Sequence, residues 1–278
     1  MTAAITIHFK KPELTSSCVD SLLADGWAPI LIWDNSDDEG ASLKVLQDRY
    51  AAEPRVRLVR SPINLGFGKG MNAALAALGR QSYSGPVLLM NNDAKVMPGM
   101  RMALEAQLSD DVVPTLVAPR LMQGGHEQGW LYYQPWLALV TRRPLPGSFV
   151  YLSGCCLLVH RSDNAQPLFD EDFFMYGEDV ELSWRMRRQG ARLLLLDRSH
   201  VCHEGSASSG QASETYERFL VQSHWLLAQK LGSNTGSRML MRALRLPSLF
   251  ARACLRSWRY RSLVPLRAAL SILNRSFC

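Results

Sequence analysis

The fold is decided by residues 86–93, PVLLMNND, where a short apolar run ends directly in two amides and a carboxylate. A short apolar run between polar segments is typical of a buried strand. Similar runs lie upstream at residues 3–9, 29–33 and 56–59. We therefore expect a strand at each of these positions, with a polar loop after it.

Helical patterns fill the spaces between the expected strands. They run from Pro12 to Leu23, around residues 42–52, and from the loop 64–70 to Leu78. Strands that alternate with helices form right-handed βαβ units and a parallel sheet. The sequence therefore predicts an α/β fold with a Rossmann-like, mainly parallel central sheet flanked by helices.

Polar side chains follow the expected strands at Asp34, Asn64 and Asp93. In open parallel sheets the ligand crevice lies beyond the carboxyl ends of the strands, so these side chains should converge on one edge. The oxygen atoms of Asn91, Asn92 and Asp93 suit a hard divalent cation that also binds a diphosphate. Turn capping explains the same three residues without a ligand, so this motif alone leaves both interpretations open.

A second acidic cluster lies in residues 169–182, FDEDFFMYGEDVEL, which mix acids with aromatic residues. Glu178 and Asp179 stand at the start of an expected helix, where the helix dipole favours carboxylates. Apolar neighbours can also raise the pKa of a carboxyl enough for proton abstraction. The cluster is therefore a candidate for acid–base chemistry.

Two further segments carry groups that can bind ligands. His203 precedes a segment rich in glycine and serine, residues 204–210. Imidazole can complete a metal shell and such a backbone can approach phosphates closely, although a single histidine is more often a surface or packing residue. Residues 130–136 contain two tryptophans and two tyrosines, which suit either a sugar platform or a local hydrophobic cluster.

Composition indicates a globular protein. The 278 residues are 47% hydrophobic and 20% charged, which allows a substantial core. The sequence has no uninterrupted apolar run of about 18 residues and no leader-like amino terminus, so we expect a cytoplasmic location. The six cysteines lack the paired spacing of a zinc site, and Cys155 and Cys156 lie in an apolar stretch, as reduced core residues do.

Charge divides the chain into two parts. The formal net charge is +6, and residues 238–278 hold nine arginines and no acid, so the preceding part is near 6 − 9 = −3. We expect a first domain at residues 1–232 and a basic amphipathic tail at residues 233–278. The tail suits the surface of an anionic inner membrane leaflet. Helices that pack on the first domain and bury their apolar faces are the alternative.

The basic tail has a helical pattern of charge. Arg238, Arg242 and Arg245 recur at helical spacing, with leucines between them. Proline is disfavoured inside a helix because it lacks the amide donor. We therefore expect Pro247 and Pro265 to divide the tail into short helices.

Six motifs occur in order along the chain. They are HFKKPEL at 8–14, WDNS at 33–36, NLGFG at 64–68, LMNND at 89–93, FFMYGEDVEL at 173–182 and HEGS at 203–206. Together they resemble the family 2 glycosyltransferases of GT-A fold, particularly the rhamnosyltransferase-like branch that builds lipopolysaccharide and other cell-surface polysaccharides. The resemblance covers roughly residues 5–232.

The resemblance implies a nucleotide-sugar site. Asp34 would hydrogen-bond the nucleobase, Asn64 and the loop at Gly66 would border the nucleotide, and Lys69 would approach the donor phosphates. The full set implied for the donor is Phe9, Asp34, Asn64, Gly66, Lys69, Asn91 and Asn92.

The resemblance also implies a metal site for Mg²⁺ or Mn²⁺. Asp93 stands where the family's D-x-D motif ends, and Asn91 replaces the first carboxylate of that motif. This replacement removes one negative charge from the metal shell. His203 matches a third contact to the metal or the diphosphate.

By the same resemblance, Asp179 is the general base, and Glu178 and Trp130 lie on the acceptor side. The implied reaction is a direct displacement that inverts the anomeric carbon, without a covalent enzyme intermediate. The implied donor is dTDP-rhamnose or a UDP-sugar. The acceptor is a hydroxyl of a lipopolysaccharide or other surface glycan, lipid-linked and reached at the cytoplasmic face of the inner membrane.

Two other functions compete with this interpretation. A sugar nucleotidyltransferase would carry a glycine-rich segment after the first strand, whereas residues 8–12 read HFKKP. A nucleic-acid-binding protein would fit the pI of about 9.1, but the sequence contains no recognisable binding motif for nucleic acid. We therefore expect a glycosyltransferase with no nucleic-acid partner.

Overall fold

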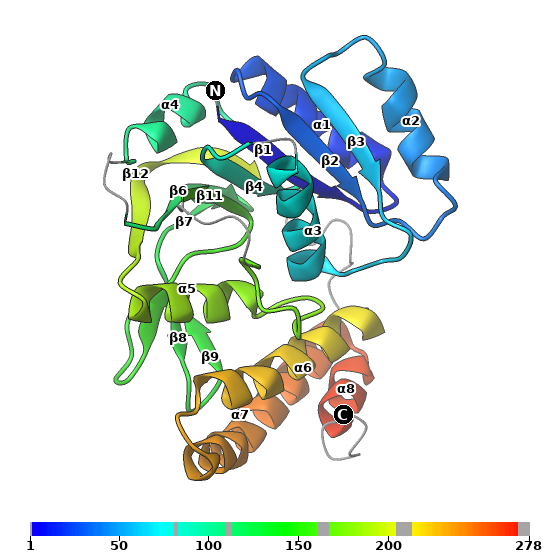
Figure 1. Cartoon of the computed structure of the whole chain (residues 1–278). Coiled ribbons are helices and arrows are strands. Elements are labelled where there is room, and N and C mark those ends of the chain that lie inside the picture. Colours follow the sequence, from blue (N-terminus) through cyan, green and yellow to red (C-terminus); the bar gives the residue numbers. More distant parts are fainter. Residues whose placement is uncertain (1, 81–82, 109–112, 161–166, 204–212, 272–278) are drawn as a thin grey trace.

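The computed structural model describes residues 2–80, 83–108, 113–160, 167–203 and 213–271 (Figure 1). Four parallel strands form one half of the central sheet, in the order β3-β2-β1-β4. They are β1 (Ala3–His8), β2 (Ile30–Asp34), β3 (Val56–Arg60) and β4 (Val87–Asn91). The strands expected from the apolar runs are thereby confirmed.

Helices cover both faces of this half-sheet because its strands bury alternate side chains on opposite sides. Ala4 packs in one core cluster and Ile5 in the other. The cluster of Ala4 includes side chains from α1 (Pro12–Ala24), α2 (Ala41–Arg49) and α4 (Met100–Glu105). The cluster of Ile5 includes side chains from α3 (Phe67–Gly79) and α5 (Glu178–Arg188).

The other half of the sheet is mixed. It contains β11 (Cys156–His160), β6 (Thr115–Gln123), β12 (Arg192–His203) and β5 (Ala94–Val96), with β7 (His126–Gln128) paired to β6. β11 is antiparallel to both β4 and β6, while β12 is parallel to β6. The expectation of a parallel sheet therefore applies to the first half, and antiparallel neighbours complete the second because they need no crossover helix.

A second, small sheet takes the place of the expected aromatic loop. Its antiparallel strands are β8 (Leu131–Gln134), β9 (Leu139–Thr141) and β10 (Phe149–Tyr151), in the order β10-β8-β9. Tyr133 is fully buried in a third core cluster, together with Val221 and Leu227 of the C-terminal region. The local hydrophobic cluster is thus the correct interpretation for Tyr133.

Three helices form the C-terminal part (Figure 1): α6 (Glu214–Leu231), α7 (Thr235–Tyr260) and α8 (Val264–Leu270). Met241 and Leu249 of α7 join the third core cluster, so the tail packs on the rest of the chain. The division into domains at residues 1–232 and 233–278 stays a prediction. Among the described helices, none has the length and apolarity to cross a bilayer.

The expected break at Pro247 is wrong, because α7 continues through this residue. Pro247 and Ala243, one turn before it, are both exposed, so water can bond the carbonyl that lacks its amide donor. Buried neighbours such as Arg245 and Leu249 hold the helix on both sides of the proline. Pro265 does stand at a helix start, in the first turn of α8.

Candidate active site

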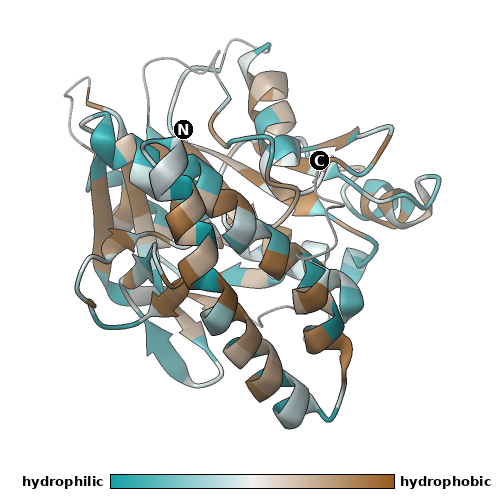
Figure 2. Cartoon of the chain, turned by 90° about the horizontal axis from the view of Figure 1, so that it is seen from below, coloured by the Kyte–Doolittle hydropathy of each residue, from teal (hydrophilic) through white to brown (hydrophobic). Residues whose placement is uncertain are grey.

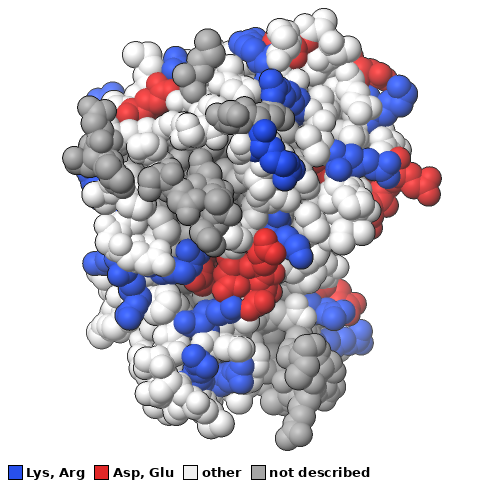
Figure 3. Space-filling model, viewed as in Figure 1, with Lys and Arg blue, Asp and Glu red and all other residues white. Residues whose placement is uncertain are grey.

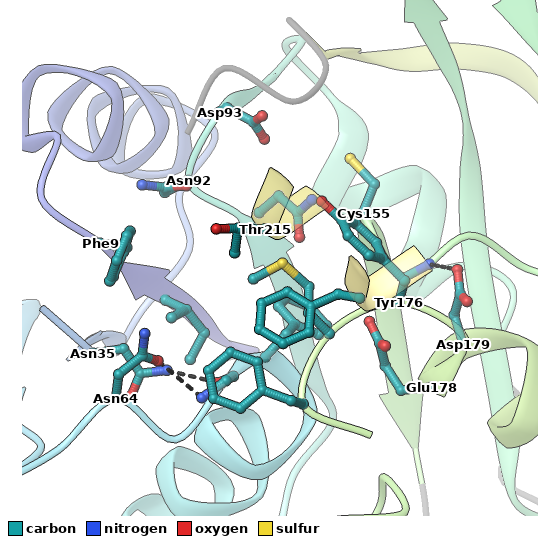
Figure 4. Close-up of a pocket in the computed structure, with 18 of the residues that line it drawn as sticks. Phe9, Asn35, Asn64, Asn92, Asp93, Cys155, Tyr176, Glu178, Asp179 and Thr215 are labelled. Carbon is teal, nitrogen blue, oxygen red and sulfur yellow. Dashed lines mark hydrogen bonds between the residues drawn. The ribbon is translucent and has the colours of Figure 1, made fainter. Parts of the chain in front are cut away.

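A cavity of about 630 Å³ opens at the carboxyl edge of the parallel strands (Figure 4). Its size is within the range of small-molecule sites. Segments from eight parts of the chain line it, which is the convergence expected from the topology. The lining residues are Ile7, Phe9, Asn35, Asn64, Gly66, Phe67, Asn91, Asn92, Asp93, Ser153, Gly154, Cys155, Phe174, Met175, Tyr176, Glu178, Asp179, His203, Ser213, Thr215 and Phe219.

Hydrogen bonds fix the loop after β3 at one side of the cavity. The Asn64 side chain accepts from the Gly66 amide at 2.9 Å, and Asn35 Nδ2 donates to the Gly66 carbonyl at 2.6 Å. Gly66 has a φ of 75°, and a Cβ there would lie 2.2 Å from the carbonyl oxygen of Phe174. This close approach lets the Phe67 amide bond the same carbonyl at 2.9 Å. Glycine is therefore required where the loop meets the acidic segment.

Strand pairing brings Asp93 and His203 together. The antiparallel ladder of β5 and β12 places His203 opposite Ala94, the residue after Asp93. Asp93 Oδ1 lies 3.2 Å from His203 Nε2, and both side chains are largely buried. A carboxylate and an imidazole beside an open cavity suit Mg²⁺ or Mn²⁺, which also accept oxygens from substrate phosphates and water.

The surroundings of this pair add amide groups. Asn91 and Asn92 line the same cavity, and Asn92 Nδ2 donates to Thr15 Oγ1 at 3.1 Å. In the described part of the chain, no third acidic, histidine or cysteine side chain joins Asp93 and His203. The glycine- and serine-rich segment expected to approach phosphates, residues 204–210, lies outside the described residues.

The carboxyls of Glu178 and Asp179 stand at the start of α5. Gly177 ends the preceding loop with a φ of 86°, which turns the chain into the helix. Asp179 Oδ2 accepts from the Gly154 amide at 3.1 Å (Figure 4), and Oδ1 accepts from the Val180 amide at 2.8 Å. These bonds tie the carboxyl to the segment before β11, so both acids border the cavity.

Burial changes the protonation of this pair. Loss of hydration raises the pKa of Asp179, while hydrogen bonds from backbone amides, such as that of Gly154, oppose the shift. Loss of hydration also raises the pKa of Glu178, and the nearby charge of Asp179 adds to the effect. Among the described residues, Glu178 Oε2 has no hydrogen-bond partner. Burial therefore disfavours a negative charge on both carboxyls at the same time.

Most of the residues proposed from the sequence meet in this cavity. They are Phe9, Asn64, Gly66, Asn91, Asn92, Asp93, Glu178, Asp179 and His203. Asp34, Lys69 and Trp130 are absent from the described lining. The roles assigned to all of these residues stay predictions.

The three other residues have different surroundings. Asp34 is fully buried behind the cavity wall, where its Oδ1 accepts from the Ser36 amide at 2.8 Å. Lys69 is exposed and points to Glu171, with Nζ 3.9 Å from Oε2. Acidic groups gather in a patch across the middle of this face, with basic groups above and below (Figure 3). Trp130 packs against the core cluster under α3 and α5, because its ring continues that apolar surface.

Sequence reasoning missed several lining residues. Asn35 and Tyr176 belong to quoted motifs, so the motifs themselves marked them. Phe174 and Phe219 stack with their ring centroids 4.8 Å apart, and Phe219 comes from α6. Nothing in the local pattern of α6 distinguishes an aromatic residue of the cavity from one of the core, since both are apolar.

Comparison with known proteins relates the chain to sugar-transferring enzymes. The family described as "Glycosyl transferase family 2" matches residues 3–165. The N-acetylglucosaminyl-diphospho-decaprenol L-rhamnosyltransferase of Mycobacterium tuberculosis is 30% identical over 222 residues, which cover 69% of this chain and 71% of the relative.

Solved structures share the fold at low sequence identity. GalNAc-T7 with UDP, GalNAc and Mn²⁺ matches with a TM-score of 0.60 and 16% identity, over 88% of this chain and 54% of that chain. The Pyrobaculum calidifontis mannosyltransferase with GDP-Man and Mn²⁺ matches with a TM-score of 0.55 and 13% identity, over 99% of this chain and 75% of that chain. This chain thus corresponds to only about half of the GalNAc-T7 chain.

Proposed function

This chain belongs to glycosyl transferase family 2, and from that premise we propose that it moves one sugar from a nucleoside diphosphate to a hydroxyl of a cell-surface glycan. One observation carries the proposal. The Asp93–His203 pair and the Asp179 carboxyl, far apart in sequence, line a single cavity. A diphosphate at the first group and an acceptor at the second would meet across the sugar.

The donor in this proposal is dTDP-rhamnose, with a UDP-sugar as the alternative. The M. tuberculosis relative named above is an L-rhamnosyltransferase, which favours rhamnose. Asn64 and Gly66 would border the nucleotide from the loop after β3. Asp34 is the residue that the motif assigns to the nucleobase, but its side chain is fully buried and lies outside the described lining of the cavity, so this contact stays a prediction.

Asp93 and His203 would hold Mg²⁺ or Mn²⁺, in line with the Mn²⁺ in two of the solved structures. The ion would supply positive charge next to the departing diphosphate. Asn91 leaves this site with one fewer negative charge than a D-x-D motif has. The donor's own phosphate oxygens would compensate, so we expect metal and nucleotide to bind together more tightly than either binds alone.

Asp179 would act as the general base. The acceptor oxygen forms a bond to the anomeric carbon, the bond from that carbon to the diphosphate breaks, and the hydroxyl proton passes to Asp179. The configuration inverts because the oxygen attacks from the side opposite the leaving group. Glu178, whose Oε2 lacks a partner among the described residues, would orient the acceptor hydroxyl.

The acceptor in this proposal is a lipid-linked glycan. The name of the M. tuberculosis relative describes a sugar joined by a diphosphate to decaprenol. Such an acceptor would bring the protein to the cytoplasmic face of the inner membrane. Family membership argues against the two alternatives weighed above, a sugar nucleotidyltransferase and a nucleic-acid-binding protein.

Thermal stabilisation by nucleotides tests this function. We expect dTDP or UDP to raise the melting temperature with Mn²⁺ present and much less with a chelator, because ligands that bind only the folded state stabilise it. Asp93→Asn should remove the metal-dependent part of the stabilisation. Glu171→Gln, in the acidic cluster of residues 169–182 but outside the cavity lining, should keep this stabilisation. The proposal fails if no nucleoside diphosphate stabilises the protein under any metal condition.

A further inference from the structure

The outer side of α7 is an apolar stripe. Its eight members recur every three or four residues, as single residues or adjacent pairs, are all exposed and carry no charge. They are Leu240, Ala243, Leu244, Pro247, Ala251, Cys254, Leu255 and Trp258. At 3.6 residues per turn they occupy an arc of about 120°. Trp258 is 83% exposed and Leu255 is 67% exposed, so the described chain leaves this stripe uncovered.

Arg245, Arg252 and Arg256 lie on the opposite half of α7 and face the protein. Arg245 is fully buried, and its Nε donates to the Pro135 carbonyl at 2.7 Å. Arg252 bonds Nε2 of the buried His224 at 3.0 Å, and Arg256 Nε donates to Glu217 at 2.7 Å. The helix therefore buries charged side chains as well as Met241, Leu249 and Ala253, whereas a surface helix usually buries its apolar face and leaves its charges outside.

The tail packs on the protein, in agreement with the second expectation, and buries Met241 and Leu249 together with arginines. It also leaves a separate apolar stripe in contact with solvent. Exposed apolar surfaces of this kind mark contact sites for a protein or a membrane. Figure 2 looks at the molecule from the side of the C-terminal helices and shows brown, apolar segments along them.

We propose that the outer stripe of α7 lies in the interfacial layer of an anionic lipid bilayer, parallel to the membrane plane. Of the nine arginines in residues 238–278, those exposed to solvent complement anionic headgroups, since this segment holds no acid. Arg259 and Arg261 are exposed beside Trp258. Tryptophan favours the membrane interface because its ring is apolar and its N–H is polar. Since α7 is not apolar enough to span a bilayer, it lies on the surface.

Charge disfavours a second copy of the chain as the occupant. If two copies met stripe to stripe, the exposed Arg259 and Arg261 of each would lie beside the contact, and residues 238–278 offer no carboxylate side chain to pair with them. Lipid phosphates supply the negative charge that the tail of another copy lacks. The benefit for catalysis, a cavity held near a lipid-linked acceptor, rests on the proposed function; the binding itself does not.

Sedimentation of the full chain with vesicles tests the proposal. The vesicles contain either phosphatidylcholine alone or phosphatidylcholine with phosphatidylglycerol. We expect strong binding to the anionic vesicles and a loss of at least about tenfold for Leu255→Ser with Trp258→Ser, because both side chains contribute buried apolar area. The control is Val45→Ser with Met102→Ser, which removes comparably exposed residues from α2 and α4 and should bind like the unchanged protein.

Tryptophan fluorescence provides a second measurement. Brominated lipids should quench the tryptophan fluorescence of the unchanged protein. Trp258→Phe should lose most of that quenching while it still sediments with vesicles. Equal binding of the Leu255/Trp258 variant and the unchanged protein overturns the proposal. A second result also overturns it: light scattering finds a dimer for the unchanged protein and a monomer for the Leu255/Trp258 variant. Neither measurement depends on catalysis. Metal-dependent stabilisation by nucleotide should be the same in the variant and in the unchanged protein. A failure of the proposed function would therefore appear in that stabilisation and not in vesicle binding.

Discussion

At the scale of single residues, the site depends on two adjacent carboxyls that differ in their hydrogen bonds. Asp179 accepts from two backbone amides, whereas Glu178 Oε2 has no partner among the described residues. The bonds to Asp179 favour its charged form, which a base requires. The charge of the pair should therefore rest mainly on Asp179 at neutral pH.

Replacing the proposed base tests this assignment. We expect Asp179→Asn to lower kcat by about 10² to 10⁴ while the KM for the donor changes little, since the base acts on the acceptor. Asp172→Asn is a matched control, because this carboxyl lies in the same acidic segment but is mostly exposed. Steady-state kinetics at saturating donor gives both values. A kcat of Asp179→Asn close to that of the control would contradict the assignment.

The raised pKa of Glu178 has a consequence for stability. Burial raises the pKa of this carboxyl in the folded protein, so the folded state binds more protons than the unfolded state. Its contribution to stability is therefore lost as pH rises. We expect Glu178→Gln to raise Tm by about 2–4 °C at pH 8 and by less at pH 5. Calorimetry at the two pH values measures this gain. A gain that does not depend on pH would contradict the buried charge as its cause.

At the scale of elements, the sequence predicted what depends on local pattern. The strands that become β1 to β4 stand where the apolar runs place them; β1, β2 and β4 are buried on both faces, and β3 is the partly exposed edge strand. The antiparallel insertion of β11 between β4 and β6 was not predictable, since strand pairing is a contact between distant segments. The same holds for β8, whose Tyr133 bonds His224 of α6 at 3.2 Å.

The candidate site shows the same division. Asp93 and Asp179 were found because each belongs to a recognisable motif. Phe219 was missed because only the packing of α6 brings it to the cavity. Lys69 and Trp130 were placed by motif and composition, but their side chains point to an acidic neighbour and to the core, respectively.

The continuous helix at Pro247 gives a prediction about α7. Proline removes one amide donor from the helix, and the Pro247 side chain is exposed. Pro247→Ala should restore the hydrogen bond and stabilise the protein by about 1–3 kcal/mol. Thermal or denaturant unfolding measures the change. Ala251→Pro, one turn later on the same exposed stripe, should destabilise the protein; a loss of stability in Pro247→Ala would mean that α7 is adapted to a bend at this residue.

At the scale of the whole molecule, three core clusters stabilise the elements that line the cavity. Two lie on the faces of the central sheet, and the third joins the small sheet to α6 and α7. The cavity takes residues from the sheet edge, α5 and α6. The basic tail is therefore a structural support for the segment that carries Phe219.

Truncation tests this support. We expect a chain that ends at Gly232 to unfold at a Tm lower by more than about 5 °C, because it loses Met241 and Leu249 from the third cluster and also the buried Arg245. It would also leave His224 and Glu217 without their arginine partners. Calorimetry of the two chains measures the effect. Equal melting temperatures would show that the tail is an independent appendage.

The register of β5 with β12 has a consequence for the living cell. Asp93 leaves the ribosome well before His203, and the pair exists only after the later strand has docked beside the earlier one. A nascent chain that ends before β12 therefore contains Asp93 but lacks His203, the other residue proposed to bind the cation. Under the proposed function, binding of the sugar donor would therefore begin only after synthesis has passed β12.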